Sequence, residues 1–382
     1  MNRFTFQNTT RIHFGEGQIA AITKDIPADA RVLVTYGGGS IKKNGVYDQV
    51  ADALKDHTWA EFSGIEPNPK YDTLMKAVTM IQEEGYDYLL AVGGGSVVDG
   101  TKFIAAAAEF AGDPWDICQF GATIERALPL GCVLTLPATG SESNTGGVIT
   151  RGTDKLPFGS ELVRPIFAVL DPAVTLTLPE RQVANGVIDA FVHIMEQYMT
   201  YPVNAKVQDR FAEGLLMTLM EEGPKALNDP KDLDVRANIM WAATLALNGL
   251  IGAGVPQDWA THMIGHELTA LHGIDHARTL SIVFPAVLKF QRDSKKDKLL
   301  QFGERAFGIT EGDDNTRIDQ TIARIVDFFH EMGVPAALSE ADLTADAIDP
   351  LVDNLKAHKM GKLGEHRAIG FDESRAILEL AV

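Results

Sequence analysis

The hydrophobic pattern changes in kind about half-way along the chain. Up to about residue 180, short runs rich in β-branched residues alternate with segments in which apolar residues recur every three or four positions. The first pattern predicts strands and the second predicts amphipathic helices. We expect strands at 30–36, 86–92, 131–137 and 165–171, and helices at 45–56, 70–85 and 97–110. This alternation is typical of βαβ units around a mostly parallel sheet.

Beyond about residue 181 the strand pattern nearly disappears. Long amphipathic segments follow one another, separated by stretches such as "GAGVPQD" and "MGVPAAL", whose Gly and Pro residues commonly interrupt helices. The change falls in "LDPAVTLTLPERQ" at 170–182, and a chain of 382 residues is long enough for two domains. The sequence therefore predicts an α/β domain over residues 1–180 and an all-helical domain over residues 181–382.

Composition and charge narrow the class of protein. Hydrophobic residues make up 45% and charged residues 23% of the chain, as in ordinary globular enzymes. The net charge of −18 disfavours a nucleic-acid or anionic-membrane partner, because both require basic patches. Cys118 and Cys132 form no C-x-x-C pair, and no signal-type segment or membrane-length apolar stretch occurs. We expect a cytoplasmic enzyme with no nucleic-acid or membrane partner.

A first glycine run follows a predicted strand. In "LLAVGGGSVVDGTK", Gly93 to Ser96 lie between that strand and a helix beginning near Val97. Backbone N–H groups at a helix start bind pyrophosphate well, and glycine lets the ligand approach them. The run is therefore a candidate phosphate-binding loop. The G-x-G-x-x-G pattern is absent, and a tight strand-to-helix turn without a ligand is the alternative.

A second glycine run, in "VTYGGGSIKK", bears on the choice of dinucleotide. Enzymes that select NAD commonly place an Asp or Glu near a strand end, where it binds the ribose 2′-hydroxyl and repels a 2′-phosphate. No acid follows Tyr36 here, whereas Gly37 to Ser40 offer N–H groups, and Lys42 and Lys43 add positive charge. The loop therefore favours NADP over NAD. A glycine hinge with two solvated lysines is the alternative.

A carboxylate and an imidazole share one helix face in "DAFVHIMEQY". Asp189 and His193 are four positions apart, so their side chains point the same way from a helix. Their neighbours are apolar, and burying an ionised carboxylate is costly unless a cation or another partner compensates it. The pair is therefore a candidate metal site, with a hydrogen-bonded Asp–His pair in the core as the alternative.

Four of the ten histidines lie in "HMIGHELTALHGIDH". His262 and His266 are four positions apart on one predicted helix, and His276 comes from the next element, which Asp275 can cap. Spacing alone does not choose among these histidines. His272 lies at the predicted helix end and is interpreted as a solvated or capping residue, while His266 is either a ligand or a neighbour of the ligands.

One combination of these residues suits a catalytic metal. It contains one oxygen and three nitrogen donors, which fit Zn²⁺ or Fe²⁺ and leave a position for water or substrate. The donors in this combination are Asp189, His193, His262 and His276.

Several dispersed motifs resemble those of one known family. "GGGSVVD", "LPATGSE", "LDPAVTLTLP", "GVIDAFVHIMEQY" and "HMIGHELTALHGIDH", in this order and spacing, resemble the iron-containing (group III) alcohol dehydrogenases. The resemblance runs over nearly the whole chain and is strongest to the bacterial NADPH-dependent aldehyde reductases and butanol dehydrogenases. It implies an α/β dinucleotide-binding domain and an all-α domain in a dehydroquinate synthase-like architecture, with the active site in the cleft between them.

The resemblance also implies roles for individual residues. It makes Asp189, His193, His262 and His276 the metal ligands, and it places His266 as the catalytic imidazole near the nicotinamide and the substrate. The implied cofactor-binding residues are Gly37, Gly38, Gly39, Ser40, Asn68, Gly94, Gly95, Ser96, Asp99, Thr135, Thr139, Ser141, Lys155 and Leu178. Many relatives carry an acid at the end of the first strand, and the glycine found here agrees with the NADP-using branch.

The implied activity is hydride transfer from NADPH to small aldehydes, and the reverse oxidation of primary alcohols, with one Fe²⁺ or Zn²⁺ per site. The resemblance further implies a homodimer. One alternative is a dehydroquinate-synthase-like lyase, which needs several Lys and Arg residues beside the metal, and the two histidine motifs contain none. A metal-dependent hydrolase that uses no dinucleotide is another alternative, and a catalytically silent binding protein is a third.

Overall fold

Every strand lies in the first half of the chain, where the hydrophobic pattern predicts strands. The computed structural model describes residues 1–382, and its last strand ends at Leu170. Six strands form one sheet in the order β1-β8-β5-β4-β2-β3, in which every neighbouring pair is parallel, and β6 and β7 form an antiparallel hairpin. The strands are β1 (Arg11–Phe14), β2 (Arg31–Tyr36), β3 (Thr58–Phe62), β4 (Tyr88–Gly94), β5 (Leu130–Leu136), β6 (Gly146–Arg151), β7 (Asp154–Gly159) and β8 (Phe167–Leu170).

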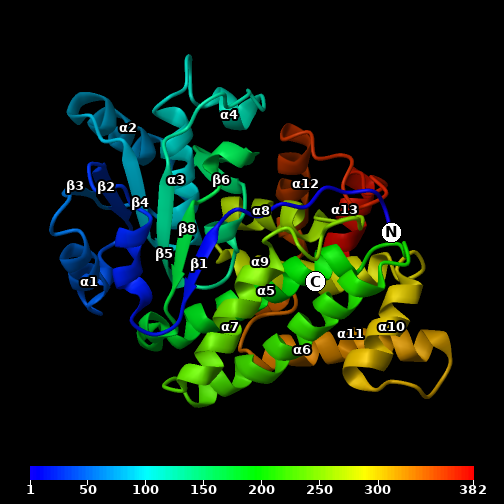
Figure 1. Cartoon of the computed structure of the whole chain (residues 1–382). Coiled ribbons are helices and arrows are strands. Elements are labelled where there is room, and N and C mark those ends of the chain that lie inside the picture. The colour runs from blue at the N-terminus through cyan, green and yellow to red at the C-terminus, as the bar shows by residue number, and fades with distance from the viewer. The chain divides into compact units, whose positions relative to one another are not determined.

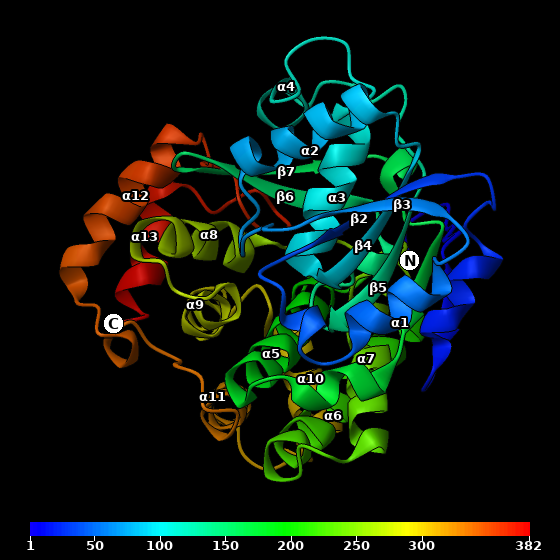
Figure 2. The same ribbon diagram turned by 90° about the vertical axis from the view of Figure 1, so that its left-hand side faces the viewer.

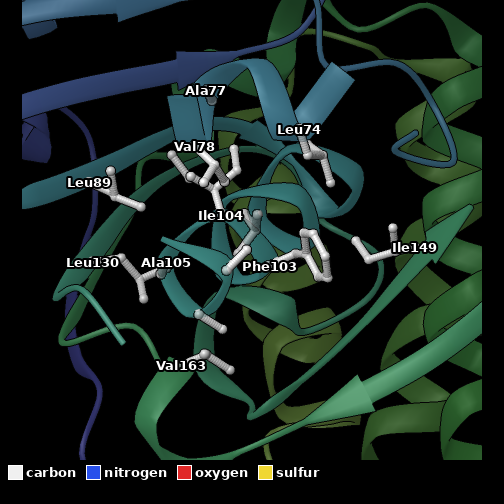
Figure 3. Close-up of a cluster of buried hydrophobic side chains, with 14 of the residues drawn as sticks. Leu74, Ala77, Val78, Leu89, Phe103, Ile104, Ala105, Leu130, Ile149 and Val163 are labelled. Atoms are coloured by element: carbon white, nitrogen blue, oxygen red, sulfur yellow. The ribbon is translucent and has the colours of Figure 1, made fainter. Parts of the chain in front are cut away.

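Helices cover both faces of the sheet. The first helices are α1 (Val46–Ala53), α2 (Tyr71–Glu84), α3 (Gly95–Ala107) and the short α4 (Asp116–Gln119). Figure 2 shows α2 and α3 above the strands and α1 below them. Side chains alternate between the faces of a strand, so Leu33 and Leu89 join the apolar core with α2 and α3, part of which Figure 3 shows, whereas Val32 and Leu90 join the core with α1.

The second half of the chain is helical (Figure 1). Its helices are α5 (Glu180–Tyr198), α6 (Lys206–Asn228), α7 (Leu233–Ala246), α8 (Ala260–His272), α9 (His276–Phe290), α10 (Lys296–Phe307), α11 (Asp314–Glu331), α12 (Ile348–Ala357) and α13 (Phe371–Glu379). Helix α5 packs against α6 and α9. Apolar residues of α8, α9, α12 and α13, among them Ile264, Val283, Leu351 and Ile377, form one buried cluster. No helix combines the length and the apolar character that crossing a membrane requires.

The predicted fold class is confirmed, and the division of the chain differs in detail from the predicted one. One compact unit contains residues 7–178 and 231–244, and we call it the α/β unit. The other contains residues 1–6, 179–230 and 245–382, and we call it the helical unit. The main boundary lies two residues from the predicted one. Most of α7 belongs to the α/β unit because Met240 packs on Leu134 of β5 and Leu170 of β8.

Candidate metal centre and dinucleotide loops

One face of α5 carries a row of polar side chains. Asn185, Asp189, His193 and Glu196 are spaced by four, four and three residues, and an α-helix of 3.6 residues per turn brings such positions to one side. Asp189, His193 and Glu196 are buried, each at most 4% exposed, among apolar neighbours of the same helix. The local sequence therefore builds a buried polar stripe in an otherwise apolar helix.

Three of the predicted metal donors converge beside this stripe. Asp189, His262 and His276 each offer one ligand atom, and these atoms all lie within 4.8 Å of one another. His276 Nε2 is 3.7 Å from Asp189 Oδ1. Two atoms bound to one Zn²⁺ at about 2.1 Å each lie roughly 3–4 Å apart, so small side-chain rotations would let the three share an ion. They come from α5, α8 and α9 and can approach an ion from different directions.

His193, the fourth predicted donor, lies next to this group. Its Nδ1 is 3.6 Å from Asp189 Oδ1, and its ring centroid is 4.5 Å from that of His262. The buried Nδ1 makes no hydrogen bond. Burial lowers the pKa of His193 to about 4; Asp189 opposes this shift and His262 adds to it. At neutral pH the ring is therefore uncharged, which is the form that binds a cation.

His266 lies beside the donors rather than among them. Its ring centroid is 5.1 Å from that of His276 and 6.4 Å from that of His262, and the residue is buried. His272, in contrast, is exposed at the end of α8, where Gly273 adopts a left-handed conformation with φ of +66°. That position agrees with the interpretation of His272 as a solvated residue.

Asp275 precedes α9 as predicted, but its side chain does not cap that helix. Its carboxylate accepts hydrogen bonds from Arg181 Nε at 2.7 Å and from Asn185 Nδ2 at 2.8 Å instead. The capping prediction was therefore wrong, because two α5 side chains compete for the carboxylate. The result is a link between α5 and the first turn of α9, which carries His276.

Glu196 is the functional candidate to which sequence reasoning gave no role. Its Oε2 is hydrogen-bonded to His262 Nδ1, and its Oε1 accepts from the backbone N–H of Thr261 at 2.7 Å. The available clue was its spacing, three residues after His193 and seven after Asp189, on the helix face already assigned to the metal.

The predicted dinucleotide loops follow three neighbouring strands of the α/β unit. The loop 37–40 follows β2, the loop 93–96 overlaps the end of β4 and the start of α3, and "PATGS" at 137–141 follows β5. In the sheet order β4 lies between β5 and β2, so the carboxyl ends of these parallel strands meet at one edge. The strands that follow β2 in sequence are added on opposite sides of it, β3 on one side and β4 and β5 on the other, and dinucleotides bind at such a switch point of strand order in parallel sheets.

Close packing explains the glycines at the end of β4 and the start of α3. A Cβ on Gly93 would lie 2.5 Å from Val97 Cγ2, and a Cβ on Gly95 would lie 2.5 Å from Thr139 Oγ1. Gly94 is less restricted, with Leu136 Cβ at 3.1 Å. Helix α3 begins at Gly95, so its first N–H groups are part of this glycine segment. Glycine is required here by the fold as well as by any bound phosphate.

Two predicted cofactor residues bind each other. Ser141 Oγ donates to Asp99 Oδ1 at 2.5 Å, and the backbone N–H of Val148 donates to Asp99 Oδ2 at 3.0 Å. Desolvation raises the pKa of Asp99, and Lys102 and Lys155 oppose that shift. Lys155 lies on β7, within the hairpin. Asp99 therefore links α3 to β6 and to the segment after β5, and its contact with a cofactor stays a prediction.

The remaining predicted cofactor residues lie at strand ends or turns of the α/β unit. Asn68 has a left-handed backbone with φ of 55°, and Gly39 has φ of 88°. Thr135 and Thr139 lie at and after the end of β5, and Leu178 is the last residue of the unit's first segment. Gly37, Gly38 and Ser40 belong to the loop after β2.

Comparison with known families covers almost the whole chain. The model described as iron-containing alcohol dehydrogenase matches residues 9–172, and the model of the C-terminal part of that family matches residues 183–382. The chain belongs to the iron-containing alcohol dehydrogenase family. The resemblance read from the dispersed motifs is thereby confirmed.

Relatives of this alcohol dehydrogenase are similar along their full length. The NADPH-dependent aldehyde reductase YqhD of Escherichia coli is 61% identical, with all of both chains covered, and the probable NADH-dependent butanol dehydrogenase 1 of Bacillus subtilis is 38% identical, again with all of both chains covered. A crystal structure of E. coli YqhD superposes with a TM-score of 0.98 at 61% identity, covering 100% of this chain and 99% of that one.

The donor chemistry fits the metal that the family name implies. Asp189 supplies a hard carboxylate oxygen and the histidines supply imidazole nitrogens, a mixture that suits Fe²⁺ or Zn²⁺ better than Mg²⁺ or Ca²⁺. The buried Nδ1 of His193, without a hydrogen bond and beside Asp189, is a further donor for such an ion. The residues of this chain therefore fit a divalent transition metal.

Proposed function

We propose that this protein reduces small aldehydes to primary alcohols with NADPH at a divalent metal, and that it catalyses the reverse oxidation. The observation that carries the proposal is the convergence of Asp189, His262 and His276 within 4.8 Å in a member of the iron-containing alcohol dehydrogenase family. The two relatives described above are named as an aldehyde reductase and a butanol dehydrogenase, which supports small aldehydes and alcohols as the substrate class.

The metal is Fe²⁺ or Zn²⁺, held by Asp189, His193, His262 and His276. When bound, the cation polarises a carbonyl group and stabilises developing negative charge on its oxygen, while NADPH supplies a hydride to the carbon. The protein's part is to offer these donors in their metal-binding forms. The uncharged ring of His193 is ready for this at neutral pH, and Asp189 offsets one positive charge of the ion.

His266 is the proposed proton donor. Its imidazole lies beside the donors, with the His276 ring 5.1 Å away. An imidazole can both donate and accept a proton, as such a role requires. In the reductive direction it delivers a proton to the oxygen of the new alcohol, directly or through water. In the oxidative direction it accepts that proton.

The dinucleotide binds the loops at the carboxyl ends of β2, β4 and β5. Backbone N–H groups at Gly94, Gly95 and Ser96 bind the pyrophosphate, and the loop from Gly37 to Ser40 accepts the adenosine ribose. The relatives named above include one NADPH-dependent and one NADH-dependent protein, so the preference rests on this chain's own residues. Glycines followed by two lysines, with no acid in the loop, support NADPH.

We also propose that the protein is a cytoplasmic homodimer. Strand β1 is at the edge of the six-stranded sheet and can pair with another chain. Both cysteines are free thiols, as is usual in a reducing compartment. Light scattering of the purified protein tests the assembly, since a monomeric mass contradicts this part of the proposal.

One assay tests the activity. Protein stripped of metal and reloaded with Fe²⁺ or Zn²⁺ should oxidise NADPH when butanal is added, and a chelator should abolish the rate. Omitting butanal gives the background rate. A metal-dependent hydrolase would not oxidise NADPH in this assay, because it uses no dinucleotide. No butanal-dependent NADPH oxidation with any of Fe²⁺, Zn²⁺, Mn²⁺ or Co²⁺ would refute the proposal.

A further inference from the structure

Glu196 joins two helices that carry candidate metal donors. It lies on α5, together with Asp189 and His193, and it makes three contacts with Asp258, two residues before α8, and with Thr261 and His262 in the first turn of α8. Its backbone carbonyl accepts from the N–H of Asp258 at 2.9 Å, its Oε1 accepts from the N–H of Thr261 at 2.7 Å, and its Oε2 is bonded to His262 Nδ1. Both carboxylate oxygens are thus engaged by the segment that presents His262.

The contact with His262 determines which ring nitrogen faces the other donors. When Nε2 of His262 binds a cation, Nδ1 carries the proton of the ring and donates it to the Glu196 carboxylate. With Nδ1 committed to Glu196, Nε2 is the nitrogen of His262 that is left to meet an ion shared with Asp189 and His276. The position is buried, with Glu196 only 2% exposed, so water does not replace this contact easily.

The start of α8 has a second anchor that does not depend on the Glu196 carboxylate. Asp258 Oδ1 accepts from the N–H of Ala260 at 2.8 Å, and its Oδ2 pairs with the buried Lys295 Nζ at 2.8 Å. Glu365 also binds Lys295, with Oε1 at 3.0 Å. The backbone of this segment is therefore also held by Lys295, the residue before α10. Loss of the Glu196 carboxylate should thus affect the orientation of the His262 ring more than the position of the segment.

We propose that Glu196 is a positioning residue, which holds His262 in the tautomer and orientation that bind the catalytic metal. The inference rests on the proposed function, because it concerns the same metal site. Carboxylates behind metal-binding histidines commonly raise the basicity of the ring and fix its direction, and their loss typically weakens metal binding by about 10–100-fold.

The decisive variant is Glu196→Gln. Glutamine has the same shape but offers one acceptor and one donor group, so it cannot accept from both Thr261 N–H and His262 Nδ1–H. When its NH₂ group faces His262, it favours the tautomer with the proton on Nε2, which cannot bind a metal. We expect Zn²⁺ to bind about 10–100-fold more weakly, measured by competition with a chromophoric chelator. We also expect the visible absorption bands of Co²⁺-loaded protein to change, because they report donor geometry.

The matched control is Glu213→Gln. Glu213 is also a buried acid of the helical unit, and its Oε1 accepts from Tyr198 at 2.8 Å, from Gln301 at 2.9 Å and from Arg305 at 2.8 Å. It touches no candidate donor. This variant should keep the Zn²⁺ affinity and the Co²⁺ spectrum of the unchanged protein, even if it melts at a lower temperature.

The possible results separate this inference from the proposed function. If the unchanged protein binds neither Zn²⁺ nor Co²⁺, both the proposed function and this inference fail. If it binds them and Glu196→Gln binds equally well with the same spectrum, only the inference fails. Should Glu196→Gln not fold, Glu196→Asp is measured instead; it keeps the charge but retracts it by one methylene, and unaltered affinity and spectrum there overturn the inference in the same way.

Discussion

Lys42 and Glu61 form an ion pair, with Lys42 Nζ 3.1 Å from Glu61 Oε1. Glu61 lies on β3 and also accepts a hydrogen bond from Tyr36, the last residue of β2, at 2.8 Å. The contacts with Tyr36 and Glu61 raise the pKa of Lys42 above its ordinary value. The loop after β2 therefore has an acid beside it in space, although none follows Tyr36 in sequence, and one of its two lysines is already paired.

Lys43 should thus contribute more than Lys42 to the preference for NADPH. Lys43 is exposed, and the structure gives it no ion pair like that of Lys42. We expect Lys43→Ala to lower the ratio of kcat/KM for NADPH to that for NADH by about tenfold, as for the loss of one charged hydrogen bond. Lys42→Ala should lower the ratio less.

Glu61→Gln provides the complementary test. Removing the acid releases Lys42 and eliminates a negative charge near the ribose loop, so the preference for NADPH should increase. Steady-state rates with both dinucleotides measure each variant. If the two lysine variants lowered the ratio of kcat/KM for NADPH to that for NADH equally, or if Glu61→Gln lowered it, the greater role of Lys43 would be contradicted.

Replacing His266 should separate catalysis from metal binding. If His266 transfers a proton and does not hold the ion, His266→Ala should lower kcat about 10²–10⁴-fold while the Zn²⁺ affinity changes little. The pH profile of kcat should lose the limb that reports this group. His272→Ala is the matched control, because His272 is an exposed histidine of the same helix. Unaltered turnover and pH profile for His266→Ala would show that the relay role is wrong.

The buried His193 predicts acid sensitivity of the metal-free protein. Its pKa is about 4 in the folded state and 6.5 in an ordinary environment. Between these values the unfolded chain binds a proton that the folded chain does not, so the free energy of unfolding falls as the pH drops from about 6.5 to about 4, by up to about 3 kcal/mol. Urea unfolding with a chelator present measures this. In His193→Gln the free energy of unfolding should fall less steeply over this pH range. An equally steep fall in that variant would show that His193 is not its cause.

Gly95 should not tolerate a side chain. The Cβ of an alanine there would lie 2.5 Å from Thr139 Oγ1 and 2.7 Å from Thr139 Cγ2, and relieving such overpacking costs about 1–3 kcal/mol. We expect Gly95→Ala to melt at a lower temperature and to have a higher KM for NADPH. Gly214→Ala is the control, since that glycine lies within α6 with open space around it. It should stabilise the helix by up to about 1 kcal/mol.

The strands found from the sequence are those buried on both faces. β2, β4, β5 and β8 are nearly continuous apolar runs, which periodicity detects readily. β1 and β3, with sequences "RIHF" and "TWAEF", form the edges of the sheet and carry polar residues. The hairpin of β6 and β7 contains four glycines and a proline, a composition typical of loops, and only pairing between its two strands makes it a ribbon.

The candidate site was predictable where its residues are close in sequence. Asp189 and His193 follow from the spacing of one helix, whereas the decision that His266 is not a ligand required the family resemblance. The partners of these residues depend on tertiary contacts. Glu196 meets His262 across 66 positions of the chain, and Asp275 meets Asn185 across 90. No local pattern reports such distances, and the same is true of the pairing of Lys42 with β3.

The chain passes between its two units four times, at residues 6, 178, 230 and 244. All the strands have been synthesised by residue 170, yet α7, whose Met240 covers Leu134 and Leu170, follows later, after α5 and α6. During translation Leu134 and Leu170 therefore stay uncovered until α5 and α6 of the helical unit, and then α7, have left the ribosome. Cutting the gene after residue 178 would yield a fragment with every strand but with exposed apolar surface, prone to aggregate.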